Sequence, residues 1–250
     1  MKKSCTWLVL LIWAILIPIF LLGGCKGRFV PMDMDDARLA WGDFEEAVYD
    51  FLIDDEKRGE SVLTVERTRN NTYAIDMVIN IDGGEHLVGA EVDGETFLPL
   101  SSYNRVLPPP EAESRKRETF AEYEGQNLSI IAHRDGEEQD YSIRLPHMVV
   151  DNESSLMMVR NLPLQVGYQK LLNLAIISTV QVAPYEIRVE GVETVQAPYG
   201  EIECYKVVYS YKGLGNVPDM FAWYSADEAK VMVKYINRNV TFILTSFEKS

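Results

Sequence analysis

Apolar and polar residues alternate one by one over much of this 250-residue chain, and no other feature constrains its fold as strongly. The clearest example is the apolar series Tyr73, Ile75, Met77, Ile79 and Ile81, whose members are separated by single residues such as Asp76 and Asn80. A period of two places successive side chains on opposite faces of an extended strand. The pattern therefore predicts a strand with one buried face.

Similar runs predict further strands along the chain, at residues 61–67, 87–92, 128–133, 141–145, 185–195, 202–211, 221–225, 231–236 and 240–247. Sequences typical of tight turns separate many of them: Asp82-Gly83-Gly84, Asp93-Gly94, Asp135-Gly136 and Pro198-Tyr199-Gly200. Short strands joined by tight turns indicate an antiparallel meander that is closed or strongly curled. The three prolines at 108–110, followed by the charged residues 111–118, predict an exposed loop.

Two segments depart from the strand pattern. Residues 151–160 begin with capping residue types and continue with helix formers, which predicts a short helix that ends before Pro163. A second short helix is expected over residues 168–176. Both would pack over or beside the sheet.

The N-terminus has the three parts of a secretory signal. Lys2 and Lys3 precede an apolar run from Leu8 to Leu22, which small residues follow. The run is shorter than the roughly 20 apolar residues that a membrane-spanning helix needs, and Pro18 interrupts it.

The end of this signal, Leu22-Gly23-Gly24-Cys25, resembles the lipobox of bacterial lipoproteins. The resemblance implies cleavage before Cys25 and attachment of acyl chains to that cysteine, and two or more chains give a stable membrane anchor. The alternative is an uncleaved anchor helix in which Cys25 has no special role. Either way, the rest of the chain lies outside the cytoplasm. Because Lys26 rather than aspartate follows, the resemblance implies the outer membrane, facing the periplasm, in a two-membrane bacterium, and the outer face of the membrane otherwise.

The chain is thus expected to comprise a signal peptide (1–24), an acidic tether (25–47) and a single β-rich domain (48–250). The acidic residues around Asp33–Asp36 lack the glycine and the distant glutamate of an EF-hand calcium loop, so they indicate a solvated spacer.

Charge and cysteine content exclude several classes of protein. A formal net charge of −14 argues against nucleic-acid binding and against electrostatic attachment to anionic lipid surfaces. Of the three cysteines, Cys5 leaves with the signal and Cys25 is lipidated, so Cys204 has no disulfide partner within the mature chain. A lone cysteine between strand residues is expected to fill the core.

Nothing local in the sequence supports catalysis or a cofactor. His86, His133 and His147 lie in separate segments without the spacing of metal ligands. No serine lies in a nucleophile-elbow motif, and Gly213-Leu214-Gly215 does not precede a helix that could bind phosphate. We expect no catalytic residue, no metal and no cofactor.

The C-terminal half contains a series of motifs: Val150-Asp151-Asn152-Glu153, Arg160-Asn161-Leu162-Pro163, Val189-Glu190-Gly191, Ala197-Pro198-Tyr199-Gly200 and Trp223-Tyr224-Ser225. Over residues 145–247 they resemble a bacterial envelope family catalogued as a domain of unknown function, which is similar in fold to the lipoprotein carriers LolA and LolB. The resemblance implies an incomplete antiparallel β-barrel wrapped over one or two short helices. It implies structural roles for four residues: Asp151 as a helix cap, Gly191 and Gly200 in turns, and Trp223 as a core anchor.

These observations lead to a functional expectation. A curled sheet with a helix at its mouth can enclose an apolar cavity. We expect a cell-envelope lipoprotein whose non-catalytic domain binds a lipid or another hydrophobic ligand. The alternative is a structural lipoprotein that docks another envelope protein, and a third class is an enzyme acting on envelope glycans or lipids.

Overall fold

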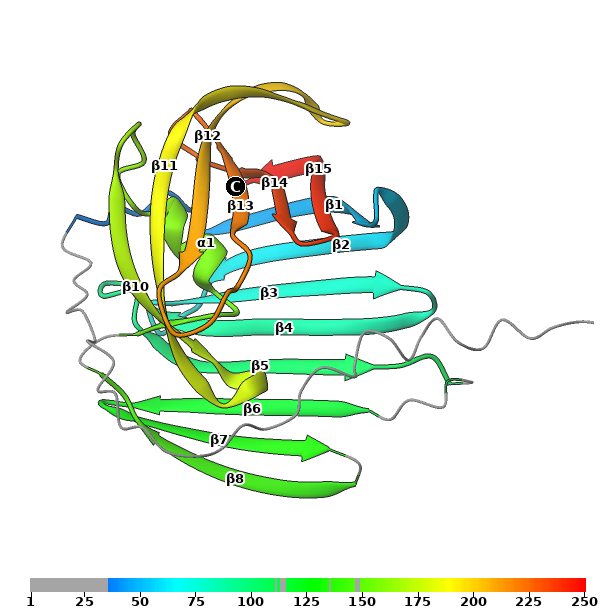
Figure 1. Cartoon of the computed structure of the whole chain (residues 1–250), viewed down its shortest axis with the longest axis vertical. Helices are drawn as coiled ribbons and strands as arrows, with labels where there is room; N and C mark the ends of the chain where they lie inside the picture. The colour runs from blue at the N-terminus through cyan, green and yellow to red at the C-terminus, as the bar shows by residue number, and fades with distance from the viewer. Residues whose placement is uncertain (1–35, 111, 113–115, 135, 147–148) are drawn as a thin grey trace, which may run out of the picture.

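A computed structural model describes residues 36–110, 112, 116–134, 136–146 and 149–250, and most of these belong to one curled β-sheet (Figure 1). One short helix, α1 (Ser155–Arg160), and one 3-10 turn, η1 (Ile177–Thr179), are the helical elements of this part of the chain. The mainly β prediction is confirmed. No helix in the described part is long and apolar enough to cross a bilayer.

The strands are β1 (Phe44–Ile53), β2 (Glu56–Arg67), β3 (Thr72–Ile81), β4 (Gly84–Asp93), β5 (Pro99–Leu107), β6 (Arg117–Glu124), β7 (Asn127–Arg134), β8 (Glu137–Arg144), β9 (Val150–Asp151), β10 (Gln169–Ile176), β11 (Gln181–Ala197), β12 (Gly200–Tyr211), β13 (Met220–Ser225), β14 (Met232–Asn237) and β15 (Val240–Lys249).

Neighbouring strands in the sheet are mostly consecutive in the sequence, and one further pairing joins the first strand to the last. From β1 to β8 and from β10 to β15, each strand pairs antiparallel with the next. β1 also pairs with β15, placing Ala47 opposite Phe247, and the short β9 adds to β10 in parallel. The sheet therefore runs without a break from β8 at one edge, through β1 and β15, to β9 at the other edge.

One face of this sheet curls around the main hydrophobic core. Alternate residues of distant strands meet there, and Ile75, Ile187 and Leu244 are each no more than 1% exposed. In Figure 1, β3 to β8 form one wall of the molecule, β10 to β12 cross over it, and α1 lies between the two. The period of two in the sequence thus reports which side chains face this interior.

Side-chain contacts join the two edge regions of the sheet, where no strand ladder connects them. η1 and β9 lie against the concave face of β5 and β6. There a second buried cluster joins Leu128 and Ile130 of β7 to Ala175 of β10 and Ile177 of η1. The result is an incomplete barrel, as expected.

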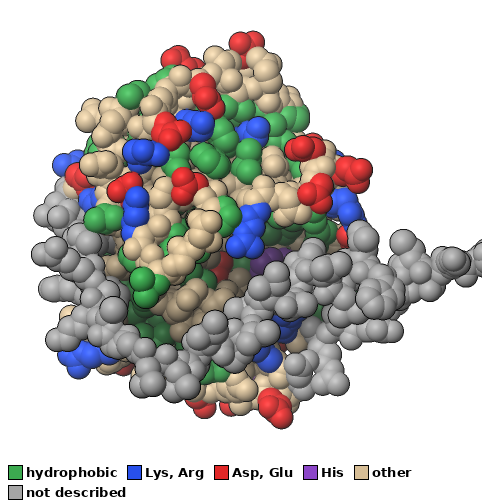
Figure 2. Space-filling model, viewed as in Figure 1, with side chains coloured by type: hydrophobic (Ala, Val, Ile, Leu, Met, Phe, Trp, Pro, Cys, Tyr) green, Lys and Arg blue, Asp and Glu red, His purple; other side chains and the backbone are tan. Residues whose placement is uncertain are grey.

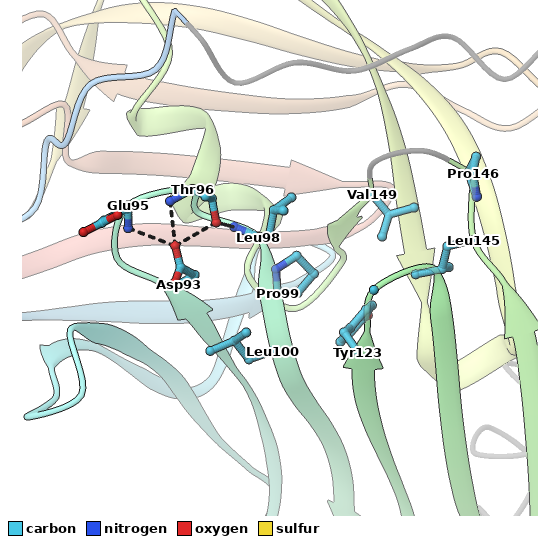
Figure 3. Close-up of a pocket in the computed structure, with 11 residues that line it drawn as sticks. Asp93, Glu95, Thr96, Leu98, Pro99, Leu100, Tyr123, Leu145, Pro146 and Val149 are labelled. Carbon is cyan, nitrogen blue, oxygen red and sulfur yellow. Dashed lines mark hydrogen bonds between the residues drawn. The ribbon is translucent and has the colours of Figure 1, made fainter.

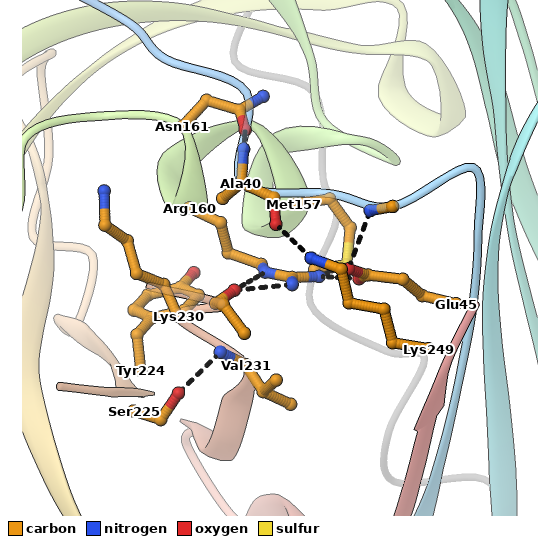
Figure 4. Close-up of polar contacts among 12 residues, drawn as sticks. Ala40, Glu45, Met157, Arg160, Asn161, Tyr224, Ser225, Lys230, Val231 and Lys249 are labelled. Carbon is orange, nitrogen blue, oxygen red and sulfur yellow. Dashed lines mark hydrogen bonds and ion pairs between the residues drawn. The ribbon is translucent and has the colours of Figure 1, made fainter. Parts of the chain in front are cut away.

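A buried ion pair attaches the C-terminal end of α1 to the sheet (Figure 4). Arg160 Nη1 donates to Glu45 Oε2 at 2.8 Å, and both side chains are 2% exposed. Arg160 also donates to the Ala229 carbonyl oxygen from Nε at 3.2 Å and from Nη2 at 2.7 Å. Lys249 Nζ lies 3.2 Å from the other Glu45 carboxylate oxygen. Because the buried charges have close partners, α1 is held at a defined place over the core.

The folded domain begins earlier than the predicted tether boundary at residue 47. β1 starts at Phe44, and Trp41 is buried with its ring edge-on to those of Tyr73 and Phe97. The boundary was placed too late because acidic residues were taken to be solvated. Glu45, within the predicted tether, is buried because Arg160 neutralises its charge.

The predicted helix at 151–160 is present as α1, but the second predicted helix, at 168–176, is wrong. This segment is β10, paired with both β9 and β11. Its residues from Leu172 to Ala175 are all buried, so both faces of the strand are covered. A strand buried on both faces loses the alternation of one-sided strands, and its apolar run cannot be told from a helix by periodicity.

Candidate ligand-binding site

A cavity of about 170 Å³ lies on the concave face of the sheet beneath α1. The same side of the molecule is hollowed in Figure 2, where hydrophobic side chains and a histidine line the recess. Residues of α1 and the segment before it form one side: Asn152, Glu153, Ser155, Leu156 and Met157. Inward-facing residues of β2–β4 and β12–β15 form the other: Leu63, Met77, Ile79, His86, Val88, Tyr209, Met220, Met232, Tyr235 and Phe242.

The size and lining of this cavity suit a hydrophobic group. An apolar protein cavity of about 150 Å³ holds a molecule such as benzene. Four of the lining residues, Met77, Met157, Met220 and Met232, are methionines. Methionine side chains are unbranched and flexible, so they adapt to occupants of different shape. The cavity can therefore take a short alkyl or aromatic group without a change of backbone.

The roof of the cavity is held by hydrogen bonds as well as by the ion pair of Arg160. The Tyr224 hydroxyl donates to the Leu156 carbonyl oxygen at 2.9 Å, and the Tyr209 hydroxyl lies 2.7 Å from that of Tyr224. Since the Tyr224 proton is used on Leu156, Tyr209 is the donor of this pair. Both tyrosines are buried. The first turn of α1 is thus fixed above strands β12 and β13.

Two acidic residues stand where β9 leads into α1. Asp151 is fully buried and its Oδ2 accepts hydrogen bonds from the hydroxyls of Ser102, at 2.7 Å, and of Tyr123. Its Oδ1 accepts the backbone N–H of Glu153 at 2.7 Å. The Glu153 carboxylate lines the cavity and accepts a hydrogen bond from Asn104 Nδ2 at 3.2 Å. Asp151 therefore joins the β9 edge to β5 and β6, and Glu153 presents a polar group to the cavity.

Burial changes the acidity of both carboxyls. It raises the pKa of Asp151, against the opposing effect of the hydrogen bonds from Tyr123 and Ser102. Burial, reinforced by the charge of Asp151, also raises the pKa of Glu153. Shifted carboxyls are candidates for catalysis. Here the Asp151 carboxylate accepts hydrogen bonds from three donors, and these bonds hold β9 against β5 and β6.

His86 completes the polar side of the cavity. Its Nε2 lies 3.0 Å from Asn104 Oδ1, which can only accept, so Nε2 carries the proton. Burial lowers the pKa of His86, which favours the neutral ring. A chain of hydrogen bonds thus runs from His86 through Asn104 to Glu153 along one wall.

A second recess, of about 330 Å³, lies at the ends of β4 to β8 (Figure 3). Of the two acidic residues that line it, Asp93 accepts three hydrogen bonds at Oδ1: from the backbone N–H groups of Thr96, at 2.7 Å, and Glu95, at 3.1 Å, and from the Thr96 hydroxyl, at 2.7 Å. The bonds from Thr96 lower the pKa of Asp93. The Asp93 carboxylate thus stabilises its own turn, and we take the more apolar cavity under α1 as the better candidate site.

The residues selected from the sequence have different outcomes. Trp223 is a core residue as expected, 7% exposed, with its indole N–H donating to Glu193. Gly200, predicted to lie in a turn, has φ of 147° and is the first residue of β12, directly after the turn residues Pro198 and Tyr199. Cys204 is buried and free, and burial raises the pKa of its thiol to about 12. Leu22, Gly23, Gly24, Cys25 and His147 lie outside the described residues.

Two of the predicted structural roles are wrong. Asp151 does not cap α1, because the cap position is Ser154 and the aspartate lies in β9. Gly191 is not in a turn. It lies inside β11 opposite Lys206, where a bulge shifts the register with β12. A glycine in a strand marks a bulge as well as a turn, and the sequence does not distinguish the two.

The sequence did not identify the cavity residues. They come from seven strands, from α1 and from the segment before it, and alternation shows only that the strand residues face inward. His86 was considered, but only as a metal ligand. In the described part of the chain no group of three or more histidine, cysteine or acidic residues could hold a metal ion.

Comparisons with known proteins find a family match and a solved structure of similar architecture. A family model described as "Protein of unknown function (DUF3108)" matches residues 46–238. The chain is similar to a solved β-barrel-like protein of the domain of unknown function DUF1849 from Brucella abortus, with 11% identity and a TM-score of 0.58, covering 84% of this chain and 99% of that one. A protein with a YmcC-like fold from Bacteroides fragilis has 12% identity and a TM-score of 0.31, covering 82% and 95%. No curated protein matches the sequence.

Proposed function

The chain belongs to the DUF3108 family, and we propose that it is a non-catalytic cell-envelope module that binds a lipid or another hydrophobic ligand in the cavity beneath α1. The observation that carries this proposal is the cavity itself. Native protein interiors are close-packed and have few voids larger than a water molecule. A mostly apolar hollow of this size, beneath a helix fixed by a buried hydrogen bond and a buried ion pair, can accept an apolar ligand group.

The proposed location rests on the N-terminal residues. Lipidation of Cys25 after cleavage at Leu22-Gly23-Gly24 would tether the domain to a membrane outside the cytoplasm. In a two-membrane bacterium this would be the outer membrane, facing the periplasm. The motifs of the C-terminal half resemble a family whose fold is similar to that of the carriers LolA and LolB, and this resemblance implies a sheet curled around a helix. That likeness supports a ligand taken from the adjacent bilayer.

A binding titration with a cavity-filling variant tests the proposal. The probe is N-phenyl-1-naphthylamine, whose fluorescence rises in apolar surroundings. Met77→Trp places a large ring in the cavity, whereas Val78→Trp places the same ring on the opposite face of β3. We expect saturable binding to the wild type and to Val78→Trp, and binding weakened at least about tenfold in Met77→Trp. No saturable binding to the wild type, or equal binding by all three, would overturn the proposal.

The second candidate function is docking of another envelope protein, and it is supported by the edge strand β8. No strand pairs with the outer side of β8 in the described part of the sheet, and most of its residues are exposed. Such edges can accept a strand from a partner. A photo-crosslinker at the exposed Asp140 of β8 would then capture one defined protein, and no lipid would co-purify.

A further inference from the structure

The polar side chains of the cavity beneath α1 donate most of their hydrogens to other parts of the protein. Six described lining residues have such side chains: His86, Asn152, Glu153, Ser155, Tyr209 and Tyr235. A hydrogen bond needs one donor and one acceptor. The hydrogens that remain on this wall therefore decide which polar group a ligand can bring into the cavity.

Two of the six, His86 and Tyr209, donate to residues that do not line the cavity. The imidazole donates from Nε2 to Asn104, and the phenol donates to the hydroxyl of Tyr224. The groups that these two side chains have left, Nδ1 of the neutral ring and the phenol oxygen, can only accept a hydrogen bond from a ligand.

Ser155 and Tyr235 are used in the same way. The Ser155 hydroxyl donates to the Asn152 carbonyl oxygen at 2.8 Å, and the Tyr235 hydroxyl donates to Met220 Sδ at 3.2 Å. A hydroxyl that has donated its one hydrogen can only accept further bonds. The other two polar side chains bond to each other, because the Asn152 amide donates to the Glu153 carboxyl. Acceptors thus predominate on this wall, which favours a ligand that brings a hydrogen-bond donor.

The charges around the cavity oppose an anionic ligand. Among the described residues that line it, none is a lysine or an arginine. Arg160 Nη1 lies 4.0 Å from Met157 Sδ in the roof, but the charge of this arginine is paired with that of Glu45. Asp151 is close enough for its charge to raise the pKa of Glu153. A carboxylate or phosphate group would therefore lose its water without meeting an opposite charge.

An ammonium group fits this wall less well than an uncharged donor. Burial, together with the charge of Asp151, raises the pKa of Glu153 to about 8, so this carboxyl holds a proton at neutral pH. An ammonium group would leave water for a mostly apolar wall that has no ionised partner for it. A hydroxyl avoids this cost. It can donate to a wall acceptor and accept the hydrogen of the Glu153 carboxyl.

We propose that the ligand of this cavity is an uncharged amphiphile whose hydroxyl group binds at Glu153 and His86 and whose alkyl chain lies among the four methionines. The inference rests on the proposed function and adds the chemical class of the ligand. Asn104 bonds to both Glu153 and His86, so these two groups belong to the same side of the cavity. The methionines supply adaptable apolar contacts for the chain.

Titration of the full-length protein labelled at its methionine methyl groups tests this inference by NMR. The signals of Met77, Met157, Met220 and Met232 report binding in the cavity itself. The probes at pH 7 are 1-hexanol, its isomer methyl pentyl ether, which has no donor, and the ions hexanoate and hexylammonium. We expect 1-hexanol to bind roughly three- to tenfold more tightly than the ether. It should bind at least about tenfold more tightly than either ion.

Two variants of Glu153 locate the hydroxyl site. Glu153→Gln keeps an uncharged donor and acceptor, so it should retain the preference for 1-hexanol over the ether. Glu153→Leu removes both groups and should bind the two isomers equally. Glu85→Leu is the matched control, because Glu85 precedes His86 on β4, is exposed and points to the opposite face, and this variant should behave as the wild type. Circular dichroism of each variant checks that the fold is retained.

The outcomes separate this inference from the proposed function. If 1-hexanol and the ether bind equally to the wild type, the cavity takes a hydrophobic group but recognition of a hydroxyl is wrong. The inference also fails, while the proposed function stands, if either ion is the tightest ligand. If none of the four probes shifts the signals of the lining methionines, both proposals fail. Because these comparisons use the wild type, they decide the question even if Glu153→Leu does not fold.

Discussion

The Tyr123 hydroxyl donates a hydrogen bond to the buried carboxylate of Asp151, and this contact links the two ends of the open sheet. Tyr123 lies on β6, which is the third strand when counting from the edge strand β8. Asp151 lies on β9, the strand at the opposite edge. Ser102 of β5 adds a second bond to the same oxygen. The barrel is thus closed by a buried polar joint, and the segment that follows this joint is the roof of the cavity.

Loss of the tyrosine hydroxyl tests this joint. Tyr123→Phe removes one donor from a buried carboxylate, which should lower the free energy of unfolding by about 1–3 kcal/mol. Tyr141→Phe is the matched control, because that hydroxyl bonds to Gln139 on the exposed face of an edge hairpin and its loss should cost about 0.5 kcal/mol or less. Urea unfolding of both variants measures the difference. Equal losses in the two would contradict a special role for the Asp151 joint.

The pH dependence of stability should reflect Glu153. Burial raises its pKa to about 8, so the folded state holds a proton that the unfolded state has released above the usual glutamate range. The free energy of unfolding should therefore decrease as the pH rises from about 5 to about 8, by at most about 1.4 kcal/mol for each unit of pKa shift. Asp151, whose pKa is also raised, contributes in the same direction at lower pH.

Glu153→Gln should flatten this dependence, because the amide does not titrate. Thermal unfolding at a series of pH values provides the measurement, with Glu201→Gln as a control at an exposed acid. An unchanged slope in Glu153→Gln would show that the carboxyl is ionised in the folded protein throughout this range.

The Glu45–Arg160 pair allows a test of how α1 is held. Arg160→Met leaves Glu45 buried without its main partner, and we expect a loss of about 3–5 kcal/mol. The double variant Glu45→Leu, Arg160→Met removes both charges and should recover much of that loss. Arg58→Met breaks an exposed pair with Asp82 and should cost about 0–1 kcal/mol. If the double variant were as unstable as Arg160→Met, the charge left on Glu45 would not be the cause.

The sequence predicted elements well where a strand has one buried apolar face. β3 is such a case, because Ile75 and its neighbours of the same face enter the core. The sequence did not predict burial correctly where it depends on a partner residue far away in the chain. Glu45 indicated a solvated tether because its partner Arg160 is 115 residues away.

Two strands next to the candidate site were missed for a related reason. No strand was predicted over β5 or β6, because several of their inward-facing residues are polar: Ser102, Asn104 and Thr119. Ser102 bonds to Asp151, and Asn104 bonds to Glu153. Local rules of patterning are expected to fail at functional sites, so the break in alternation was itself a signal.

The proposed lipid anchor can be tested independently of the fold. Cells expressing the wild type should incorporate labelled palmitate into the protein, and Cys25→Ser should not. Cys204→Ser provides the control, because that thiol is buried in the domain and its loss should leave labelling unchanged. Equal labelling of the wild type and Cys25→Ser would refute lipidation at this residue.

Native mass spectrometry of protein purified from membranes tests the central claim most directly. If the cavity beneath α1 holds a hydrophobic ligand, the wild type and Val78→Trp should carry an additional mass that collisional activation releases as a lipid. Met77→Trp, whose added ring fills the cavity, should be recovered without that mass. A wild type that carries no ligand, or a Met77→Trp variant that carries the same ligand in the same amount, would contradict the claim.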